Sequence, residues 1–417
     1  MSTLLRLATA GSVDDGKSTL VGRLLHDSKS VLADQLAAVE RVSADRGLES
    51  ADLALLTDGL RAEREQGITI DVAYRYFATA RRSFVLADCP GHVQYTRNTV
   101  TGSSTADAVV LLIDARRGVL EQTRRHLAVT ALMRVPHVIV AVNKIDLVDH
   151  SQEVFDAVAA DVRRIAAELG IEDAHAIPVS ALAGDNVVDR SPRTPWYDGP
   201  SLLDLLETLP VAVDPAHEEF RMPVQLVIRP QGAARDPRHV EYRGYAGQLA
   251  SGSVQVGDEV VVAPSGLRSR VVGIDLGDRE LDVAVAPQSV TLRLADDIDI
   301  SRGDLISSAS APVVPTQDVK AVVCWLGDAP LRVGARLLLK HGAKTVPAVV
   351  RGIEGRLDLD TLRHEPSSEL ALNDIGEVSV RVGTPLPVES YAHSRTGGAF
   401  LLIDPSDGYT LAAGMVQ

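Results

Sequence analysis

The sequence predicts an α/β domain with a doubly wound, mostly parallel sheet, followed by two all-β barrels. Over roughly the first 210 residues, short apolar runs alternate with segments of helical period, the pattern of a parallel sheet covered by helices. Helical periodicity then nearly vanishes, and short strand patterns separated by Gly-Asp and Ser-Gly turns take its place. A linker at residues 307–318 divides this β region. We therefore expect domains at residues 1–212, 220–307 and 317–417.

Five apolar runs in the first domain indicate buried parallel strands, because helices cover both faces of such strands. They are residues 4–10, 83–88, 108–115, 137–143 and 175–180. The clearest helix is predicted at residues 151–170, where apolar residues recur on one face. Ser151 is a suitable N-cap for this helix, and Gly170 is suited to end it.

The composition limits the classes of function. The chain has 417 residues, of which 45% are hydrophobic and 24% charged, as in ordinary globular proteins. A net charge of −14 disfavours broad nucleic-acid binding. Two cysteines, Cys89 and Cys324, do not suggest a disulfide framework. The sequence shows neither a signal peptide nor an apolar run near the ~20 residues that span a bilayer. We expect a cytoplasmic protein that binds neither nucleic acid nor membrane.

The stretch "GSVDDGKST", residues 11–19, matches the pattern G-x-x-x-x-G-K-[ST]. A predicted strand precedes it and a helix-compatible segment follows, which argues against an incidental glycine-rich turn. Glycines let successive backbone N–H groups point at phosphate oxygens. We expect Lys17 to bridge the β- and γ-phosphates and Ser18 to bind Mg²⁺. The loop does not distinguish ATP from GTP.

Two later motifs favour guanine. In "NKID", residues 143–146, the carboxylate of Asp146 can accept hydrogen bonds from guanine N1–H and its 2-amino group. Adenine offers neither donor there, so the carboxylate would be left unpaired. A backbone N–H of "SAL", residues 180–182, could donate to guanine O6. "NKID" by itself could be a strand-to-helix turn, but its position after a phosphate loop favours base recognition.

"DCPGH", residues 88–92, supplies groups for hydrolysis. Asp88 can hold the Mg²⁺ shell through water, and Gly91 can offer its N–H to the γ-phosphate. His92 would orient the attacking water; its alternative is an ordinary surface or core histidine. In "EREQGITI", Thr69 suits a second protein ligand of Mg²⁺, although it also fits an alternating strand. We interpret Cys89 as a small packing residue.

Together, "GSVDDGKST", "GITI", "DCPGH", "NKID" and "SAL" resemble the translational-type GTPases, which have a GTPase domain followed by two β-barrels. Longer strings, among them "LTDGLRAEREQGITIDVAYRYF", "YRGYAGQLASG" and "DDIDISRGDL", resemble the GTPase subunit of bacterial sulfate adenylyltransferases over essentially the whole chain. The resemblance implies an α/β P-loop GTPase domain that uses GTP and Mg²⁺. It also implies a heteromeric pair with a smaller catalytic subunit. That pair makes adenylyl sulfate and pyrophosphate from ATP and sulfate, driven by GTP hydrolysis.

The resemblance also assigns site residues by position. It implies Mg²⁺ ligation by Ser18 and Thr69, with Asp88 acting through water, and catalysis by His92. The implied GTP contacts are Gly11, Ser12, Val13, Asp14, Asp15, Gly16, Lys17, Ser18, Thr19, Asp88, Cys89, Pro90, Gly91, His92, Asn143, Lys144, Ile145, Asp146, Ser180, Ala181 and Leu182. Cys89 stands where the family more often has threonine, and the segment "RPQGAARDPRHVEYRGYAG" is longer than its family counterpart. Some relatives carry a C-terminal adenylyl sulfate kinase domain; here we expect that activity from another protein.

Two other functions share these motifs. An elongation-factor-like carrier of aminoacylated RNA would have the same GTPase motifs and barrels, but the net charge and the "DGLRAEREQGITIDVAYRYF" string disfavour it. A kinase acting on adenylyl sulfate could use the same phosphate loop, but "NKID" opposes it because that motif selects guanine.

Overall fold

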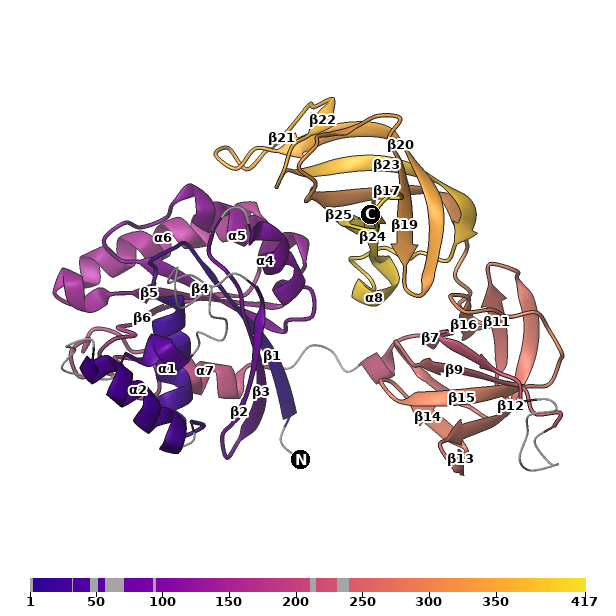
Figure 1. The fold of residues 1–417 in the computed structure, drawn as a ribbon, viewed down its shortest axis with the longest axis horizontal. Coiled ribbons are helices and arrows are strands. Elements are labelled where there is room, and N and C mark those ends of the chain that lie inside the picture. The colour runs from indigo at the N-terminus through magenta and orange to yellow at the C-terminus, as the bar shows by residue number, and fades with distance from the viewer. Residues whose placement is uncertain are drawn as a thin grey trace. The chain divides into compact units, whose positions relative to one another are not determined.

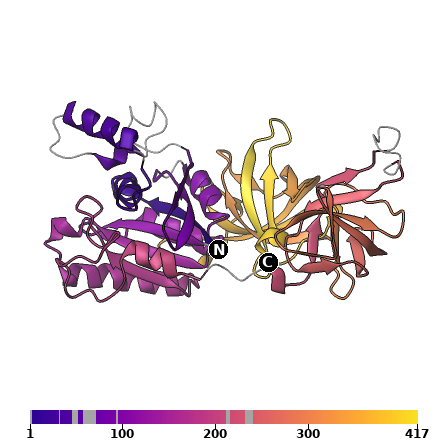
Figure 2. The ribbon, with the colours of Figure 1, turned by 90° about the horizontal axis from the view of Figure 1, so that it is seen from below.

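The computed structural model describes residues 3–31, 33–45, 52–56, 71–92, 95–210, 215–230 and 240–417 (Figure 1). Contacts within the chain define two compact units. Unit 1 consists of Met1–Ala212 and Asp358–Arg363, and unit 2 consists of Val213–Leu357 and His364–Gln417. Helices and strands alternate in unit 1, whereas strands dominate unit 2 (Figure 2). Within the described residues, no helix combines the length and apolar character needed to cross a membrane.

Unit 1 is built on a mixed sheet whose described strands run in the order β2-β3-β1-β4-β5-β6. The edge strand β2 is antiparallel to β3, and the other neighbours are parallel. The strands are β1 (Thr3–Gly11), β2 (Ala73–Ala78), β3 (Arg82–Asp88), β4 (Ala108–Asp114), β5 (His137–Asn143) and β6 (Ala174–Pro178). Every residue of β4 and β5 is buried, as expected for central strands covered on both faces.

The five predicted strands are all present, with small differences at their ends. Strand β6 ends two residues earlier than the predicted residue 180, because Ser180 leaves the sheet to form an isolated bridge with Asp185. Among the described residues of unit 1, the helical elements are α1 (Lys17–Asp27), α2 (Ala33–Asp45), η1 (Leu53–Leu56), α4 (Thr96–Ser103), α5 (Glu121–Leu132), η3 (Ile145–Val148), α6 (Gln152–Glu168) and α7 (Leu202–Thr208).

Helix α6 forms as its sequence predicts. The hydroxyl oxygen of Ser151 accepts a hydrogen bond from the backbone N–H of Val154 at 3.3 Å, which is an N-cap. Its buried face includes Phe155, Val158, Val162 and Ile165. Gly170 follows its C-cap with φ +71°, a conformation that glycine adopts without strain.

The C-terminal end of α7 is held by a buried cation. Arg82, 7% exposed at the start of β3, donates from Nη1 to the carbonyl oxygens of Leu206 at 2.9 Å and Leu209 at 2.7 Å. These carbonyls lie at the negative end of the helix and have no partner within it. Arg82 therefore fastens α7 to the sheet.

Replacing Arg82 with methionine is expected to lower the free energy of unfolding by about 2–4 kcal/mol, because two buried carbonyls lose a charged donor. Urea unfolding of the purified variant measures this loss. The matched control is Arg81→Met: Arg81 is 66% exposed and pairs with Glu207 at 3.2 Å, so its loss should stay below about 1 kcal/mol. If both variants lose the same free energy of unfolding, Arg82 contributes no more to stability than the exposed Arg81 does.

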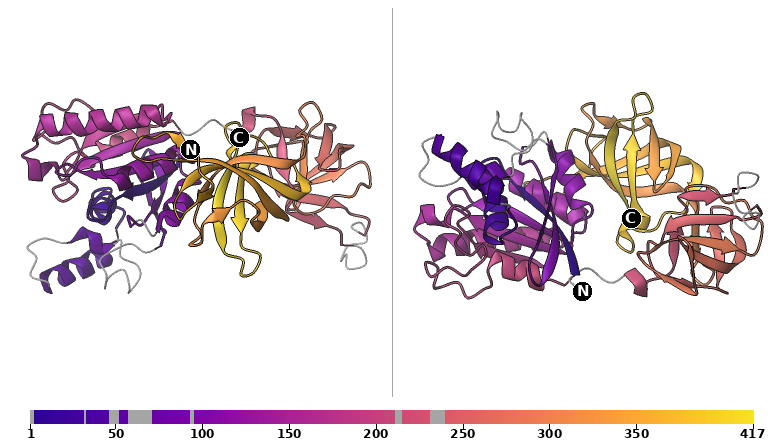
Figure 3. Two further views of the ribbon diagram at one scale, coloured as in Figure 1. Left: turned by 90° about the horizontal axis from the view of Figure 1, so that it is seen from above. Right: turned by 60° about the horizontal axis from the view of Figure 1, so that its bottom comes forward.

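Unit 2 contains two barrels of antiparallel strands (Figure 3). In the main sheet of the first barrel the described strands run in the order β7-β16-β11-β12-β15-β9-β8, with β13 beside β12, and β10 and β14 form a separate antiparallel pair. Strands β7 and β8 are separated by only Val224 and Gln225, so this one bent segment pairs at both ends of the sheet and closes it. The strands are β7 (Arg221–Pro223), β8 (Leu226–Ile228), β9 (Gly244–Gln248), β10 (Ser253–Gln255), β11 (Glu259–Ala263), β12 (Leu267–Leu276), β13 (Arg279–Leu281), β14 (Val283–Val285), β15 (Ser289–Leu294) and β16 (Leu305–Ser308).

The main sheet of the second barrel has the order β19-β24-β25-β17-β23-β20-β21 in its described strands, and a further pairing of β19 with β20 closes it; β18 and β22 form a separate antiparallel pair. The predicted linker at 307–318 is shorter than expected: Ser307 pairs with Val261 inside the first barrel, and β17 already begins at Thr316. The elements are β17 (Thr316–Trp325), β18 (Leu331–Arg332), β19 (Arg336–His341), β20 (Lys344–Leu357), β21 (His364–Glu365), β22 (Glu369–Leu370), β23 (Ile375–Leu386), α8 (Arg395–Gly398), β24 (Ala399–Ile403) and β25 (Thr410–Val416).

Candidate nucleotide-binding site

Four of the predicted site motifs, residues 11–19, 88–92, 143–146 and 180–182, gather at one edge of the unit 1 sheet, where its parallel strands have their carboxyl ends. Strands β1, β3, β4, β5 and β6 end there, at Gly11, Asp88, Asp114, Asn143 and Pro178. In open α/β sheets this edge is where ligands bind. The topology therefore brings together segments that lie up to about 170 residues apart in the sequence.

The loop between β1 and α1 has a backbone conformation that lets neighbouring segments pack closely against it. Its residues Gly11, Asp14 and Gly16 have φ values of +146°, +69° and +92°. A Cβ on Gly16 would lie 2.5 Å from Nδ2 of Asn143, so only glycine fits there. A Cβ on Gly91 would lie 2.2 Å from Nζ of Lys17, so the segment after β3 also passes directly against the loop.

Lys17 places a buried positive charge at the N-terminus of α1. Its side chain is 7% exposed, and Nζ donates to the carbonyl oxygens of Gly11 and Ser12, each at 2.8 Å. Burial lowers the pKa of Lys17, and the nearby charges of Asp88 and Asp15 oppose that shift. A cation and a helix N-terminus at one point attract an anion strongly. The buried hydroxyl oxygen of Ser12 has no hydrogen-bond partner among the described residues, which also fits a polar ligand.

Asp88 is held in place by a residue that sequence patterns did not reveal. The hydroxyl of Thr9 donates to Oδ1 of Asp88 at 2.7 Å and accepts from the backbone N–H of Cys89 at 3.3 Å. Thr9 and Asp88 are partners in the parallel register of β1 and β3, which only a three-dimensional pairing shows. Cys89 is fully buried and its burial raises the pKa of the thiol, as expected of a packing residue.

Asn143 connects the phosphate loop to the loop after β6. Its Nδ2 donates to the carbonyl oxygen of Asp15 at 2.7 Å, and its Oδ1 accepts from the backbone N–H of Ala181 at 2.9 Å. The side chain is 2% exposed, so both bonds are shielded from water. The Asn143 amide therefore fixes the distance between the predicted phosphate-binding loop and the predicted base-binding loop.

Lys144 and Asp114 form a second connection. Lys144 has φ +62°; its Nζ donates to the carbonyl oxygen of Asp14 and lies 3.1 Å from Oδ2 of Asp114. Asp114, at the end of β4, also accepts from Nη2 of Arg116 at 2.6 Å. Burial raises the pKa of Asp114, but these bonds from Arg116 and Lys144 outweigh it and hold the pKa well below its usual range. The carboxylate is therefore ionised and orients Lys144.

Asp146 lies in the first turn of η3 and is partly exposed. Among the described residues, its carboxylate makes no hydrogen bond, so both oxygens can accept from a ligand. In the neighbouring loop, Ser180 and Ala181 are buried and Leu182 is 68% exposed. Arg23 of α1 supports that loop by donating from Nε to the carbonyl oxygen of Ala181 at 3.2 Å.

Comparison with known proteins identifies the family. Residues 2–214 match the family model of the elongation factor Tu GTP binding domain, and residues 318–417 match the GTP-eEF1A C-terminal domain-like model. The chain is 53% identical to the "Bifunctional enzyme CysN/CysC" of Mycobacterium tuberculosis, over 100% of this chain and 67% of that protein. It is 50% identical to "Sulfate adenylyltransferase subunit 1" of Laribacter hongkongensis, over 99% of this chain and 85% of that protein.

The chain belongs to the sulfate adenylyltransferase subunit 1 family. A second protein named "Sulfate adenylyltransferase subunit 1", from Cellvibrio japonicus, is 48% identical over 99% of this chain and 86% of that protein. The family predicted from the motifs and the fold class of a GTPase domain followed by two β domains are thus confirmed.

In this family member, the predicted contact residues fall into two groups by burial. Thr69 lies outside the described residues, so its assignment to Mg²⁺ stays a prediction. The buried group is Gly11, Ser12, Asp15, Lys17, Asp88, Cys89, Pro90, Gly91, Asn143, Ile145, Ser180 and Ala181. The partly or fully exposed group is Val13, Asp14, Gly16, Ser18, Thr19, His92, Lys144, Asp146 and Leu182. His92 has its ring centroid 6.0 Å from that of Tyr95.

A buried histidine also lies close to the phosphate loop, since Gly11 and Lys17 act on it. His126 of α5 is 1% exposed, and its Nε2 lies 3.2 Å from Nε2 of Gln122. Burial, together with the charge of Lys17, lowers the pKa of His126 to about 3 against the opposing effect of the Gly11 carbonyl. The histidine is therefore neutral in the folded protein at neutral pH.

Stability of the ligand-free protein should consequently fall on acidification. The pKa of His126 is about 3 when folded and 6.5 when unfolded, so its contribution is complete above pH 6.5 and is lost as pH falls toward 3. Between pH 8 and pH 5.5 this amounts to about 1.4 kcal/mol, measurable by urea unfolding at both pH values. His126→Gln should remove that part of the loss. The control His175→Gln, at a side chain 42% exposed, should retain it; the same pH dependence in both variants would rule His126 out.

Proposed function

We propose that this chain is the GTP-hydrolysing subunit of a heteromeric sulfate adenylyltransferase. It would couple GTP hydrolysis to the formation of adenylyl sulfate and pyrophosphate from ATP and sulfate. The observation that carries the proposal is 48–50% identity with proteins named "Sulfate adenylyltransferase subunit 1" over 99% of the chain. The buried Lys17 at the start of α1 supports the nucleotide part of this function.

The chemistry assigned to the site follows from its residues. Lys17 and the backbone N–H groups of its loop would bind the β- and γ-phosphates. Ser18, with Asp88 through water, would hold Mg²⁺, which when bound neutralises charge that develops on the transferred phosphoryl group. His92 would orient the attacking water, with Thr9 keeping Asp88 in position. Asp146 would accept from the N1–H and the 2-amino group of guanine.

We assign the backbone donor for guanine O6 to one residue of the loop at 180–182. The N–H of Ala181 is already donated to Asn143, so it serves the base only if that bond is shared or exchanged. The N–H of Leu182, in the exposed part of the same loop, is the group we assign to O6. We place the partner, a smaller catalytic subunit, in the cytoplasm with this chain; both cysteines are outside disulfides, which supports a reducing compartment.

The experiment combines this chain with a candidate smaller subunit and measures adenylyl sulfate formation from ATP and sulfate. We expect GTP to raise the yield, and a non-hydrolysable GTP analogue to leave the yield at the level measured with ATP and sulfate but without GTP. GTP that is hydrolysed without raising the yield would refute the coupling. GTP-dependent retention of aminoacylated tRNA by the chain on a filter would favour the elongation-factor-like alternative instead.

A further inference from the structure

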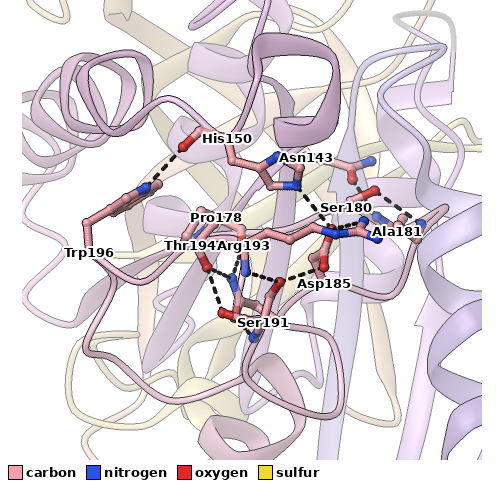
Figure 4. Close-up of polar contacts among 12 residues, drawn as sticks. Asn143, His150, Pro178, Ser180, Ala181, Asp185, Ser191, Arg193, Thr194 and Trp196 are labelled. Carbon is pink, nitrogen blue, oxygen red and sulfur yellow. Dashed lines mark hydrogen bonds and ion pairs between the residues drawn. The ribbon is translucent and has the colours of Figure 1, made fainter.

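The loop after β6 is attached to the end of η3 by side chains outside the predicted site (Figure 4). Asp185 closes the turn that begins at Ser180: its carbonyl oxygen accepts from the N–H of Ser180 at 3.2 Å, and the two residues form a β-bridge. His150 lies two residues after the end of η3, and its N–H donates to the carbonyl oxygen of Ile145 at 2.9 Å. Each residue is thus fixed through its backbone to one of the two segments assigned to the base.

The side chains of these two residues meet. Nε2 of His150 lies 3.3 Å from Oδ2 of Asp185, and since a carboxylate only accepts, the imidazole donates from this nitrogen. The side chains of His150 and Asp185 are 19% and 10% exposed. Burial raises the pKa of Asp185, but bonds from Ser191 and His150, with the charge of Arg193, outweigh it and lower the pKa. The carboxylate is therefore ionised and available to His150.

The surrounding loop holds this pair in place (Figure 4). The hydroxyl of Ser191 donates to Oδ1 of Asp185 at 2.6 Å, which fixes the other carboxylate oxygen. Nε1 of Trp196 donates to the carbonyl oxygen of His150 at 3.0 Å. Arg193 reaches Oδ2 of Asp185 at 3.4 Å, but its side chain is 59% exposed, so its attraction is screened by water. His150 is accordingly the better-shielded partner of Asp185.

We propose that Asp185 and His150 are positioning residues that set the distance between the two base-reading segments and so determine discrimination between guanine and hypoxanthine. The inference rests on the guanine site proposed above. Hypoxanthine has O6 and N1–H but lacks the 2-amino group. Only a base held at the correct distance from Asp146 can use that group while its O6 stays on the loop at residues 180–182. A wider spacing would lose the 2-amino contact first.

The test compares the dissociation constants of GDP and IDP, measured by isothermal titration for the intact chain. In Asp185→Asn, which keeps the size and the acceptor for Ser191, we expect GDP to bind about 3- to 30-fold more weakly, in line with coupling energies of neighbouring residues. The preference for GDP over IDP should fall several-fold. A variant that is merely less stable would weaken both nucleotides equally and leave the preference unchanged.

Further variants separate the two partners. His150→Leu should reproduce Asp185→Asn, the double variant should add nothing to either, and His150→Gln, which keeps a donor, should recover most of the preference. Asp198→Asn is the matched control, because this carboxylate lies in the same loop, is 99% exposed and is 3.8 Å from Arg190; it should behave as the parent protein.

The outcomes distinguish this inference from the function on which it rests. If the parent protein binds ADP as well as GDP, the guanine site itself is wrong. If the parent prefers GDP but Asp185→Asn and His150→Leu both keep the full preference over IDP, the guanine site stands and the positioning role is overturned. Should Asp185→Asn fail to fold, the His150→Leu and His150→Gln pair decides the matter.

Discussion

Replacing Asp146 with asparagine is expected to weaken GDP binding at least about 10²-fold and to transfer the preference of the protein to xanthine nucleotides. The carboxylate would accept two hydrogen bonds from guanine, and charged acceptors contribute about 1.5–3 kcal/mol each. The amide of asparagine presents a donor where an acceptor is required. Xanthine carries an oxygen in place of the 2-amino group, so the same amide suits it.

The measurement is a competition between GDP and XDP for the purified variant. Asp149→Asn is the matched control: Asp149 lies three residues further along, is exposed, and has φ +53°, which asparagine tolerates. That variant should keep the parent preference. An Asp146→Asn protein that still selects GDP would show that the carboxylate does not contact the base.

His92→Ala should slow GTP hydrolysis by about 10²-fold or more and leave GTP affinity nearly intact, because a group that orients water acts on the reaction and not on ground-state binding. His92 is exposed at the end of "DCPGH", beside the buried Gly91.

Single-turnover hydrolysis and binding of a non-hydrolysable GTP analogue report the two effects separately. His26→Ala, at a partly exposed histidine of α1 that pairs with Asp27, should change neither quantity appreciably. Unaltered hydrolysis in His92→Ala would remove this histidine from the mechanism, whereas a parallel loss of affinity would assign it to binding instead.

Local signals predicted most of unit 1. The parallel strands and helix α6 follow from apolar periodicity and from the Ser151 cap, which act over a few residues. Thr9, Asp114 and Arg23 were not predicted, since what they do depends on strand register and helix placement, and neither leaves a pattern in the chain. For the same reason the bond between Ala181 and Asn143 could not be foreseen from "SAL" and "NKID".

The two hydrogen bonds of the Asn143 amide, to Asp15 and Ala181, have a consequence for nucleotide release. Asn143 joins the phosphate loop to the loop after β6, so a displacement of one loop also displaces the other. A nucleotide bound to both loops would therefore lose its base contacts and its phosphate contacts together. Nucleotide dissociation would then be a single concerted step. A nucleotide-exchange factor that displaced either loop would accelerate dissociation, so it would need to bind only one of the two loops.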